Sequence, residues 1–217
     1  MLYIVSTPIG NLKDITFRAI DTLREVDLIL AEDTRRTGIL LKRWLIKDKQ
    51  IISYNDANKT RVTKQAIELL RQGKDLALVS DSGTPGISDP GFYLIREAIK
   101  YNIQISPIPG PTALISALVC SGLPTDKFEF YGFIPKKQSQ KEKFFKNLKD
   151  TTVIFYESPH RIIKTLKTMN NIIPEKNIVI ARELTKKFEE FIRGTVKGVY
   201  NKLKDKELKG EIVVILH

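Results

Sequence analysis

The most informative group of hydroxyl and carboxylate side chains lies in residues 80–91, which read S-D-S-G-T-P-G-I-S-D-P-G. This loop follows an apolar run at residues 76–79 that predicts a buried strand. Its glycines let the backbone approach a ligand closely, and its prolines stiffen the loop. Since open α/β sheets bind ligands at the carboxyl ends of their strands, the stretch indicates a binding loop. An ordinary long turn capped by Asp81 is the alternative.

A second concentration of charge, A-E-D-T-R-R-T, occupies residues 31–37 at the end of another predicted strand. It holds two carboxylates and two guanidinium groups. A strand exit of this kind is typical either of a functional site or of a helix cap held by an ion pair, and both interpretations stay open here.

The elements that would position these residues alternate between strand and helix. Apolar runs predict strands at residues 2–5, 27–31, 50–54, 76–79 and 103–108. Helical spacing predicts helices between them at residues 17–25, 60–72 and 92–101. The alternation predicts an N-terminal α/β domain over residues 1–122, with a mostly parallel sheet and helices on both of its faces.

The last helix of this domain is expected within residues 109–122, with Pro111 and Thr112 at its start. This segment is nearly all apolar, which predicts a buried helix whose first N–H groups are open to a ligand. Cys120, the single cysteine, is therefore expected to be a small core residue.

The composition changes after residue 122. Residues 123–127 are a plausible linker, and residues 123–217 are expected to form a smaller, mixed α/β C-terminal domain. Within it, residues 136–149 gather lysines around Phe144 and Phe145. This segment is either a nucleic-acid contact or a solvated helix whose aromatic side chains face the core.

The charge balance of the chain indicates which class of partner it binds. The formal net charge of +11 favours a polyanion such as nucleic acid, although a compositional bias of the source would produce the same total. Two histidines and one cysteine predict neither a metal site nor a disulfide. The sequence has no bilayer-length apolar run and no leader at its start, so we expect a cytoplasmic protein that does not bind membranes.

Several blocks of the chain resemble one known family. They include S-T-P-I-G-N-L-K-D-I-T, P-I-P-G-P-T-A and F-Y-E-S-P-H-R, and they occupy residues 6–16, 31–37, 80–91, 107–113, 122–135, 155–161 and 181–195. Together they resemble the tetrapyrrole methylase superfamily of S-adenosylmethionine-dependent methyltransferases. Within it the chain looks like the enzymes that methylate the 2′-oxygen of a cytidine in the decoding region of small-subunit (16S) ribosomal RNA.

The resemblance implies two α/β domains with S-adenosylmethionine in the cleft between them, a homodimer, and a substrate in the small ribosomal subunit. It also implies a set of cofactor neighbours, all in loops at strand ends or at a helix start: Pro8, Ile9, Ser80, Asp81, Thr84, Thr112, Ala113, Tyr156, Glu157, Arg182 and Glu211.

Methyl transfer to a ribose hydroxyl requires in-line alignment, and a base or cation near the oxygen would add to the rate. The candidates are Glu183, Lys186, Asp33 and Arg35. Lys186 suits the role of base only if burial or nearby cations lower its pKa. For each candidate the alternative is a structural ion pair or a phosphate contact.

Two departures from the family pattern keep other functions open. Residues 53–58 read S-Y-N-D-A-N where relatives tend to carry a histidine, and the basic extension that many relatives carry after the last strand is missing. One alternative is a small-molecule methyltransferase like the tetrapyrrole enzymes. The other is a ribosome-associated assembly protein that has lost catalysis.

Overall fold

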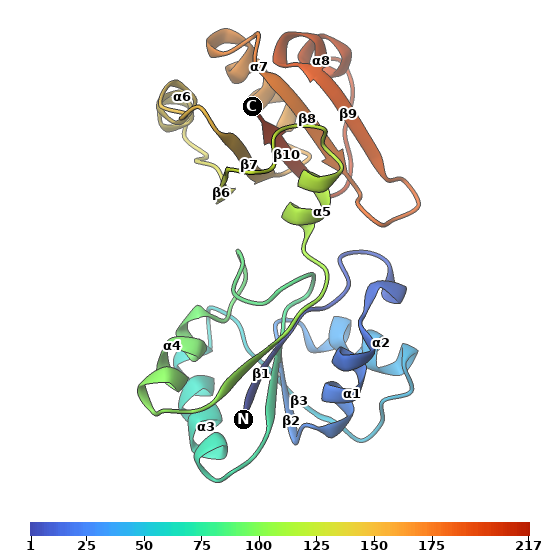
Figure 1. Cartoon of the computed structure of the whole chain (residues 1–217), viewed down its shortest axis with the longest axis vertical. Coiled ribbons are helices and arrows are strands. Elements are labelled where there is room, and N and C mark those ends of the chain that lie inside the picture. The colour runs from blue at the N-terminus through green and yellow to red at the C-terminus, as the bar shows by residue number, and fades with distance from the viewer. The chain divides into compact units, whose positions relative to one another are not determined.

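The computed structural model describes residues 1–217 and divides into two compact units, Met1–Thr112 and Ala113–His217. Each unit is built on a five-stranded sheet (Figure 1). None of the helices is both long and apolar enough to cross a membrane.

The first unit is a parallel sheet with the strand order β3-β2-β4-β1-β5. Its strands are β1 (Leu2–Val5), β2 (Leu28–Ala31), β3 (Gln50–Ser53), β4 (Leu76–Val79) and β5 (Ile105–Ile108). The connecting segments form η1 (Leu12–Asp14), α1 (Phe17–Glu25), α2 (Thr34–Arg43), α3 (Lys59–Arg71) and α4 (Phe92–Lys100).

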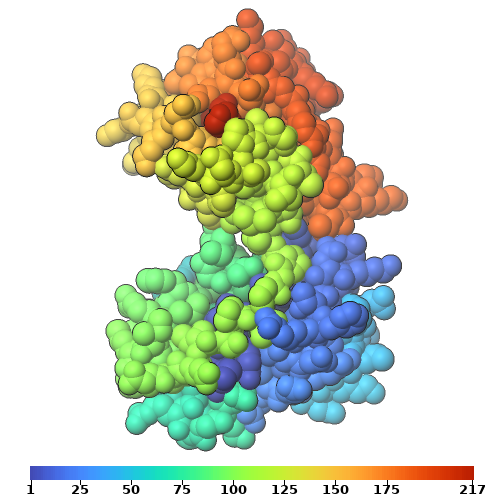
Figure 2. Space-filling model, in the orientation of Figure 1, coloured from blue at the N-terminus to red at the C-terminus, as the bar shows by residue number.

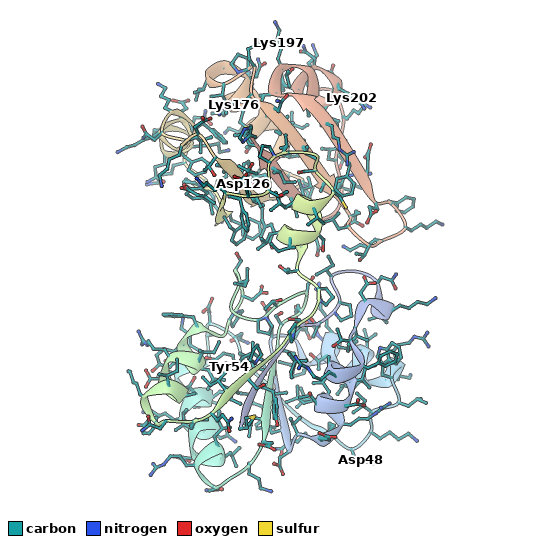
Figure 3. The ribbon with its side chains drawn as sticks, in the orientation of Figure 1. Asp48, Tyr54, Asp126, Lys176, Lys197 and Lys202 are labelled. Atoms are coloured by element: carbon teal, nitrogen blue, oxygen red, sulfur yellow. The ribbon has the colours of Figure 1, made fainter.

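Helices cover both faces of this sheet, as predicted. One apolar cluster joins α1 and α2 to residues such as Ile29 and Val79, and another joins α3 and α4 to Leu30 and Leu78. Neighbouring residues of β2 and β4 therefore belong to different cores, which is why these strands are apolar at every position. Tyr54, labelled in Figure 3, is only 1% exposed and lies in the second cluster.

The second unit is a mixed sheet with the order β6-β7-β10-β8-β9, in which only β6 and β7 are parallel. Its strands are β6 (Phe128–Phe133), β7 (Thr152–Glu157), β8 (Asn177–Arg182), β9 (Glu190–Thr195) and β10 (Ile212–Leu216). Its helices are α5 (Ala113–Val119), α6 (Gln138–Lys146), α7 (Ile162–Ile172) and α8 (Val196–Leu203). The prediction of a smaller, mixed α/β unit is confirmed.

Three helices of this unit cover one face of its sheet. Phe145 of α6, Leu166 of α7 and Val199 of α8 pack with Phe155 and Val214 in one buried cluster. Phe144 packs partly against the same cluster, so the aromatic residues of the basic helix face the core. The lysines of this segment are left on the solvent side, apart from one buried lysine described below.

The segment that follows Thr112 differs from the prediction. The helix α5 has only seven residues, and the side chains of Ile115 and Val119 are 38% and 67% exposed. Cys120 lies just beyond the helix and is exposed, so its prediction as a core residue was wrong. Because α5 packs against β7 and β10, it belongs to the second unit (Figure 2), and the units divide ten residues before the expected boundary at residue 122.

Candidate functional site

The loops after β1 and β4 are joined by backbone hydrogen bonds. The Thr7 N–H donates to the Gly83 carbonyl over 2.8 Å, and the Gly83 N–H donates back over 3.0 Å. The Thr7 hydroxyl also donates to the carbonyl of Ser80 over 3.1 Å. A Cβ on Gly83 would lie 3.4 Å from Ile9, so the two predicted binding loops are in close contact.

A pair of hydroxyl groups extends this contact to the loop after β5. Ser6 Oγ and Thr84 Oγ1 are 2.9 Å apart, and Thr84 Oγ1 donates to the Pro111 carbonyl over 3.3 Å. A Cβ on Gly110 would lie 2.9 Å from Ser6 Cβ, which explains the glycine in P-G-P-T. The three loops thus lie together at one edge of the first sheet. Thr112, the last residue of the first unit, follows the third of these loops.

Carboxylates from β2 and β4 meet beside these loops. The Asp33 N–H donates to Asp81 Oδ1 over 2.9 Å, and the Asp81 N–H donates to Glu32 Oε2 over 3.3 Å. Arg36 Nε lies 3.6 Å from Asp81 Oδ2 and offsets part of the negative charge. Asp89, which follows in the same loop as Asp81, adds a further carboxylate to the group.

Burial and mutual repulsion raise the pKa values of two of these carboxyl groups. Burial, and next the charge of Glu32, raises the pKa of Asp89 to about 6. Burial also raises the pKa of Glu32, and the Asp81 charge adds to this effect. A cationic ligand would relieve the repulsion. Neither Glu32 nor Asp89 was predicted as a site residue, although they lie in the sequence blocks 31–37 and 80–91.

Asp33 and Arg35 form a helix cap, which was one of the two interpretations of this strand exit. Asp33 is the N-cap residue of α2, and its Oδ1 accepts from the Arg35 N–H over 2.8 Å. The Arg35 guanidinium folds back and donates to both carboxylate oxygens, over 3.0 and 2.6 Å. These bonds hold the pKa of Asp33 well below its usual range, so this carboxylate is a poor proton acceptor.

The other pair of catalytic candidates lies in the second unit, after β8. Lys186 Nζ donates to Glu183 Oε1 over 2.9 Å and to Glu211 Oε2 over 3.0 Å. Glu183 adopts a left-handed backbone conformation with φ of 52°. Gly210, in the turn before β10, has a φ of 90° and a Cβ there would also collide with the Glu183 side chain, so this position favours glycine.

The pKa of Lys186 decides whether this lysine can act as the base. Burial alone would lower the pKa of Lys186, but its hydrogen bonds to Glu183 and Glu211 outweigh burial and raise it. The Lys186 ammonium, in turn, lowers the pKa of Glu183. Lys186 is therefore a cation at neutral pH, and the condition for a lysine base is not met. Arg182 lies alongside and donates to Glu190 Oε2 over 3.1 Å.

Glu157 at the end of β7 is enclosed within the second unit. Its side chain has no exposed surface, and it accepts from the Ser158 N–H at 2.8 Å and from the Thr165 hydroxyl at 2.7 Å. Arg161 Nε lies 3.2 Å away as its ion-pair partner. The buried Lys141 donates to Thr165 over 2.9 Å. Glu157 therefore supports neighbouring residues, whereas the adjacent Tyr156 is only partly buried.

The structure places the predicted cofactor residues in two groups, one in each unit. The first unit brings together the loop residues after β1, β4 and β5, namely Pro8, Ile9, Ser80, Asp81, Thr84 and Thr112. The second unit holds the residues at the start of α5, the end of β7 and the β8–β10 end, namely Ala113, Tyr156, Glu157, Arg182 and Glu211.

Known proteins resemble this chain in sequence and in fold. The chain is 51% identical over 219 residues to the ribosomal RNA small subunit methyltransferase I of Hydrogenobaculum sp. (strain Y04AAS1), covering 99% of this chain and 94% of the relative. It is 47% identical over 217 residues to the protein of that name from Thermotoga maritima, covering 99% and 97%. A uroporphyrin-III C-methyl transferase from Thermus thermophilus, solved in complex with S-adenyl homocysteine, superposes with a TM-score of 0.64 at 14% identity, covering 99% of this chain and 96% of that one.

The family described as tetrapyrrole (corrin/porphyrin) methylases matches residues 1–200. This match covers the loops of the first unit and the β7 and β8 strand ends of the second. With relatives this similar over nearly the full chain, the protein belongs to the tetrapyrrole methylase family and, within it, to the branch of the ribosomal RNA small subunit methyltransferase I proteins.

Proposed function

We propose that the protein is an S-adenosylmethionine-dependent methyltransferase that modifies the 2′-oxygen of a cytidine in the decoding region of small-subunit ribosomal RNA. The observation that carries the proposal is the 47–51% identity to proteins named ribosomal RNA small subunit methyltransferase I, which extends over 99% of this chain. The net charge of +11 suits an RNA substrate, since Lys and Arg neutralise phosphates.

The residues of the first unit suit the cofactor. When bound, S-adenosylmethionine supplies an electrophilic methyl group on a positively charged sulfur. The carboxylates of Asp81, Glu32 and Asp89 lie beside hydroxyl groups and turn carbonyls, a donor set that suits a cationic ligand with several hydroxyl and amino groups. The same loops would hold it through Pro8, Ile9, Ser80, Thr84 and Thr112. In the second unit, Ala113, Tyr156, Arg182 and Glu211 keep the roles that the family resemblance implies.

In this proposal, alignment of the ribose hydroxyl with the methyl group supplies most of the rate enhancement, since the hydroxyl is only weakly acidic. Lys186 remains protonated between its two carboxylates, so it acts as a cation that stabilises negative charge on the reacting oxygen. Asp33 and Arg35 hold the start of α2 and position Asp81 through the Asp33 N–H. Glu157 is a positioning residue for the end of β7.

The same proposal includes the form of the substrate, the cellular compartment and the oligomeric state. The substrate is the assembled small subunit rather than free RNA, the protein works in the cytoplasm as a homodimer, and neither a metal nor a membrane takes part.

The decisive experiment is transfer of a labelled methyl group from S-adenosylmethionine to small ribosomal subunits that lack the modification. Nuclease digestion and mass analysis of the nucleosides should identify 2′-O-methylcytidine. A protein that binds the cofactor but leaves the RNA unlabelled would contradict the proposal and favour a small-molecule substrate. RNA binding without any affinity for the cofactor would instead favour an assembly protein.

A further inference from the structure

A β-bulge changes the direction of one aromatic side chain at the edge of the second sheet. Phe130 of β6 pairs with Ile154, and Phe133 pairs with Tyr156, so β6 advances three residues where β7 advances two. Gly132 in the bulge has a φ of 58°. Bulges are rare in parallel pairs, and they often redirect a side chain next to an active site. Here the bulge brings Phe133 to the same face of the sheet as Phe130.

Phe133 is held in place but remains open to solvent. Its ring meets the Tyr156 ring edge to face, with 5.7 Å between centroids, and Phe130 contacts the same tyrosine at 5.0 Å. Nevertheless, the Phe133 side chain is 61% exposed. Most of the apolar surface of this ring is therefore available to a ligand and is not used in core packing.

The segment after Phe133 is anchored by the buried network around Glu157. Arg161 donates to the carbonyls of Ile134 and Pro135, over 3.1 and 3.4 Å, and its other contact is the ion pair with Glu157. Ile134 is itself 2% exposed. The aromatic ring is therefore presented by a rigid segment, which lowers the entropic cost of binding a ligand on it.

Two lysines, Lys136 and Lys137, directly follow this rigid segment. Both are exposed, and neither ammonium group forms a hydrogen bond or an ion pair. An exposed aromatic ring next to free cations is the combination by which proteins bind single-stranded nucleic acid, with bases stacked on the ring and phosphates near the cations. Aromatic rings stack on any base, whereas lysines select for the polyanion.

We propose that Phe133 is a stacking platform for an unpaired RNA base beside Tyr156, and that Lys136 and Lys137 bind the flanking phosphates. The inference rests on the proposed function and deepens it. A base on the Phe133 ring would lie next to Tyr156, which is one of the proposed cofactor neighbours.

The test compares Phe133→Ala, Phe133→Tyr and Phe128→Ala. Phe128 lies at the other end of β6 and is 39% exposed, so it is a matched control on the same strand. Binding is measured with fluorescein-labelled octacytidylate, and activity with unmodified small subunits. Phe133→Ala should weaken oligonucleotide binding and raise KM for subunits by about 5- to 100-fold, because one base loses its stacking partner. Phe133→Tyr and Phe128→Ala should stay within about twofold of wild type, because an aromatic ring remains at 133 in both.

A second comparison tests the lysines. Neutralising Lys136 and Lys137 to Gln should reduce the slope of log affinity against log salt by roughly one per residue. The control pair is Lys197 and Lys202, which project from α8 (Figure 3) and should leave the slope unchanged.

Two results would overturn the inference. One is oligonucleotide binding by Phe133→Ala equal to that of wild type. The other is an equal loss in Phe133→Ala and Phe133→Tyr together with loss of cofactor affinity, which would indicate a structural role. If wild type transfers no methyl group to subunits, the proposed function fails, whereas the binding comparison still decides the role of Phe133.

Discussion

The Asp33 N–H donates to Asp81 Oδ1 over 2.9 Å, so the cap of α2 is tied to the carboxylate that follows β4. This bond links two strand ends that are 48 residues apart in sequence. Asp81 therefore does two things at once: it satisfies a backbone donor and contributes charge to the edge where we place the cofactor.

Two substitutions separate these roles of Asp81. Asp81→Asn keeps an oxygen acceptor for the Asp33 N–H, so stability should be close to that of wild type, whereas loss of the charge should weaken cofactor binding about tenfold. Asp81→Ala should lose affinity and also about 1 to 3 kcal/mol of stability, because the donor is left unsatisfied. Calorimetric titration and urea unfolding measure the two quantities. Equal stability of the two variants would argue against the structural role.

Asp89 should make the stability of the protein depend on pH. The folded protein holds this proton with a pKa of about 6, whereas the reference value is 3.8. The stabilisation is thus fully present below about pH 4 and is lost as pH rises through 6. Asp89→Asn should be more stable than wild type by about 1 to 3 kcal/mol at pH 7.5 and equal to it at pH 4. Denaturant unfolding at both pH values tests this, and an advantage that is independent of pH would refute the assignment.

Glu157→Gln should destabilise the second unit by about 2 to 4 kcal/mol, because Arg161 loses the partner of a buried ion pair. Glu129→Gln is the control, since its ion pair with Lys149 lies at the surface and should leave the unfolding midpoint unchanged. Thermal unfolding followed by circular dichroism compares the two. Similar midpoints for both variants would mean that the buried network contributes little.

Gly132→Ala tests the bulge. A residue with a Cβ at a φ of 58° costs about 1 kcal/mol, and relaxing that strain would turn Phe133 away from Tyr156. Gly38→Ala within α2 is the matched control, because a Cβ there has no neighbour within 4 Å and alanine favours helix. We expect lower stability for the first variant and equal or higher stability for the second. The reverse order would show that the bulge is not under conformational constraint.

The role of Lys186 can be read from a pair of variants. Its raised pKa makes it a cation throughout the neutral range, so Lys186→Arg should keep activity within about tenfold of wild type. Lys186→Met should lose about 100-fold in kcat, because the charge near the reacting oxygen is gone. An inactive arginine variant, together with a wild-type rate that rises with a lysine-like pKa, would restore the lysine to the role of base.

Most of the fold could be predicted from hydrophobic patterns. Residues 2–5, 17–25 and 76–79 have the predicted element type and bounds. The helix α2 was not predicted, because charged residues and Gly38 interrupt its apolar spacing, and Asp33 was as compatible with a site as with a cap. The exposure of Cys120 was mispredicted because an apolar run does not show where a short helix ends.

The candidate site was harder to predict, because its chemistry depends on contacts between distant residues. The loops at residues 6–9 and 80–84 could be identified from their composition, but not the hydrogen bonds that join them. Asp89 was missed for the same reason: its raised pKa depends on burial and on Glu32, more than fifty residues away. Similarly, burial of Glu157 depends on α6 and α7 closing over it.

The exposed Cys120 gives the chain an internal pair of optical reporters. It is the single thiol and lies in the second unit, whereas Trp44, the single tryptophan, lies just after α2 in the first. A maleimide acceptor dye on this thiol would pair with one native donor, without any engineered residue. Energy transfer between them, measured with and without cofactor and RNA, would report the distance between these two positions of the chain.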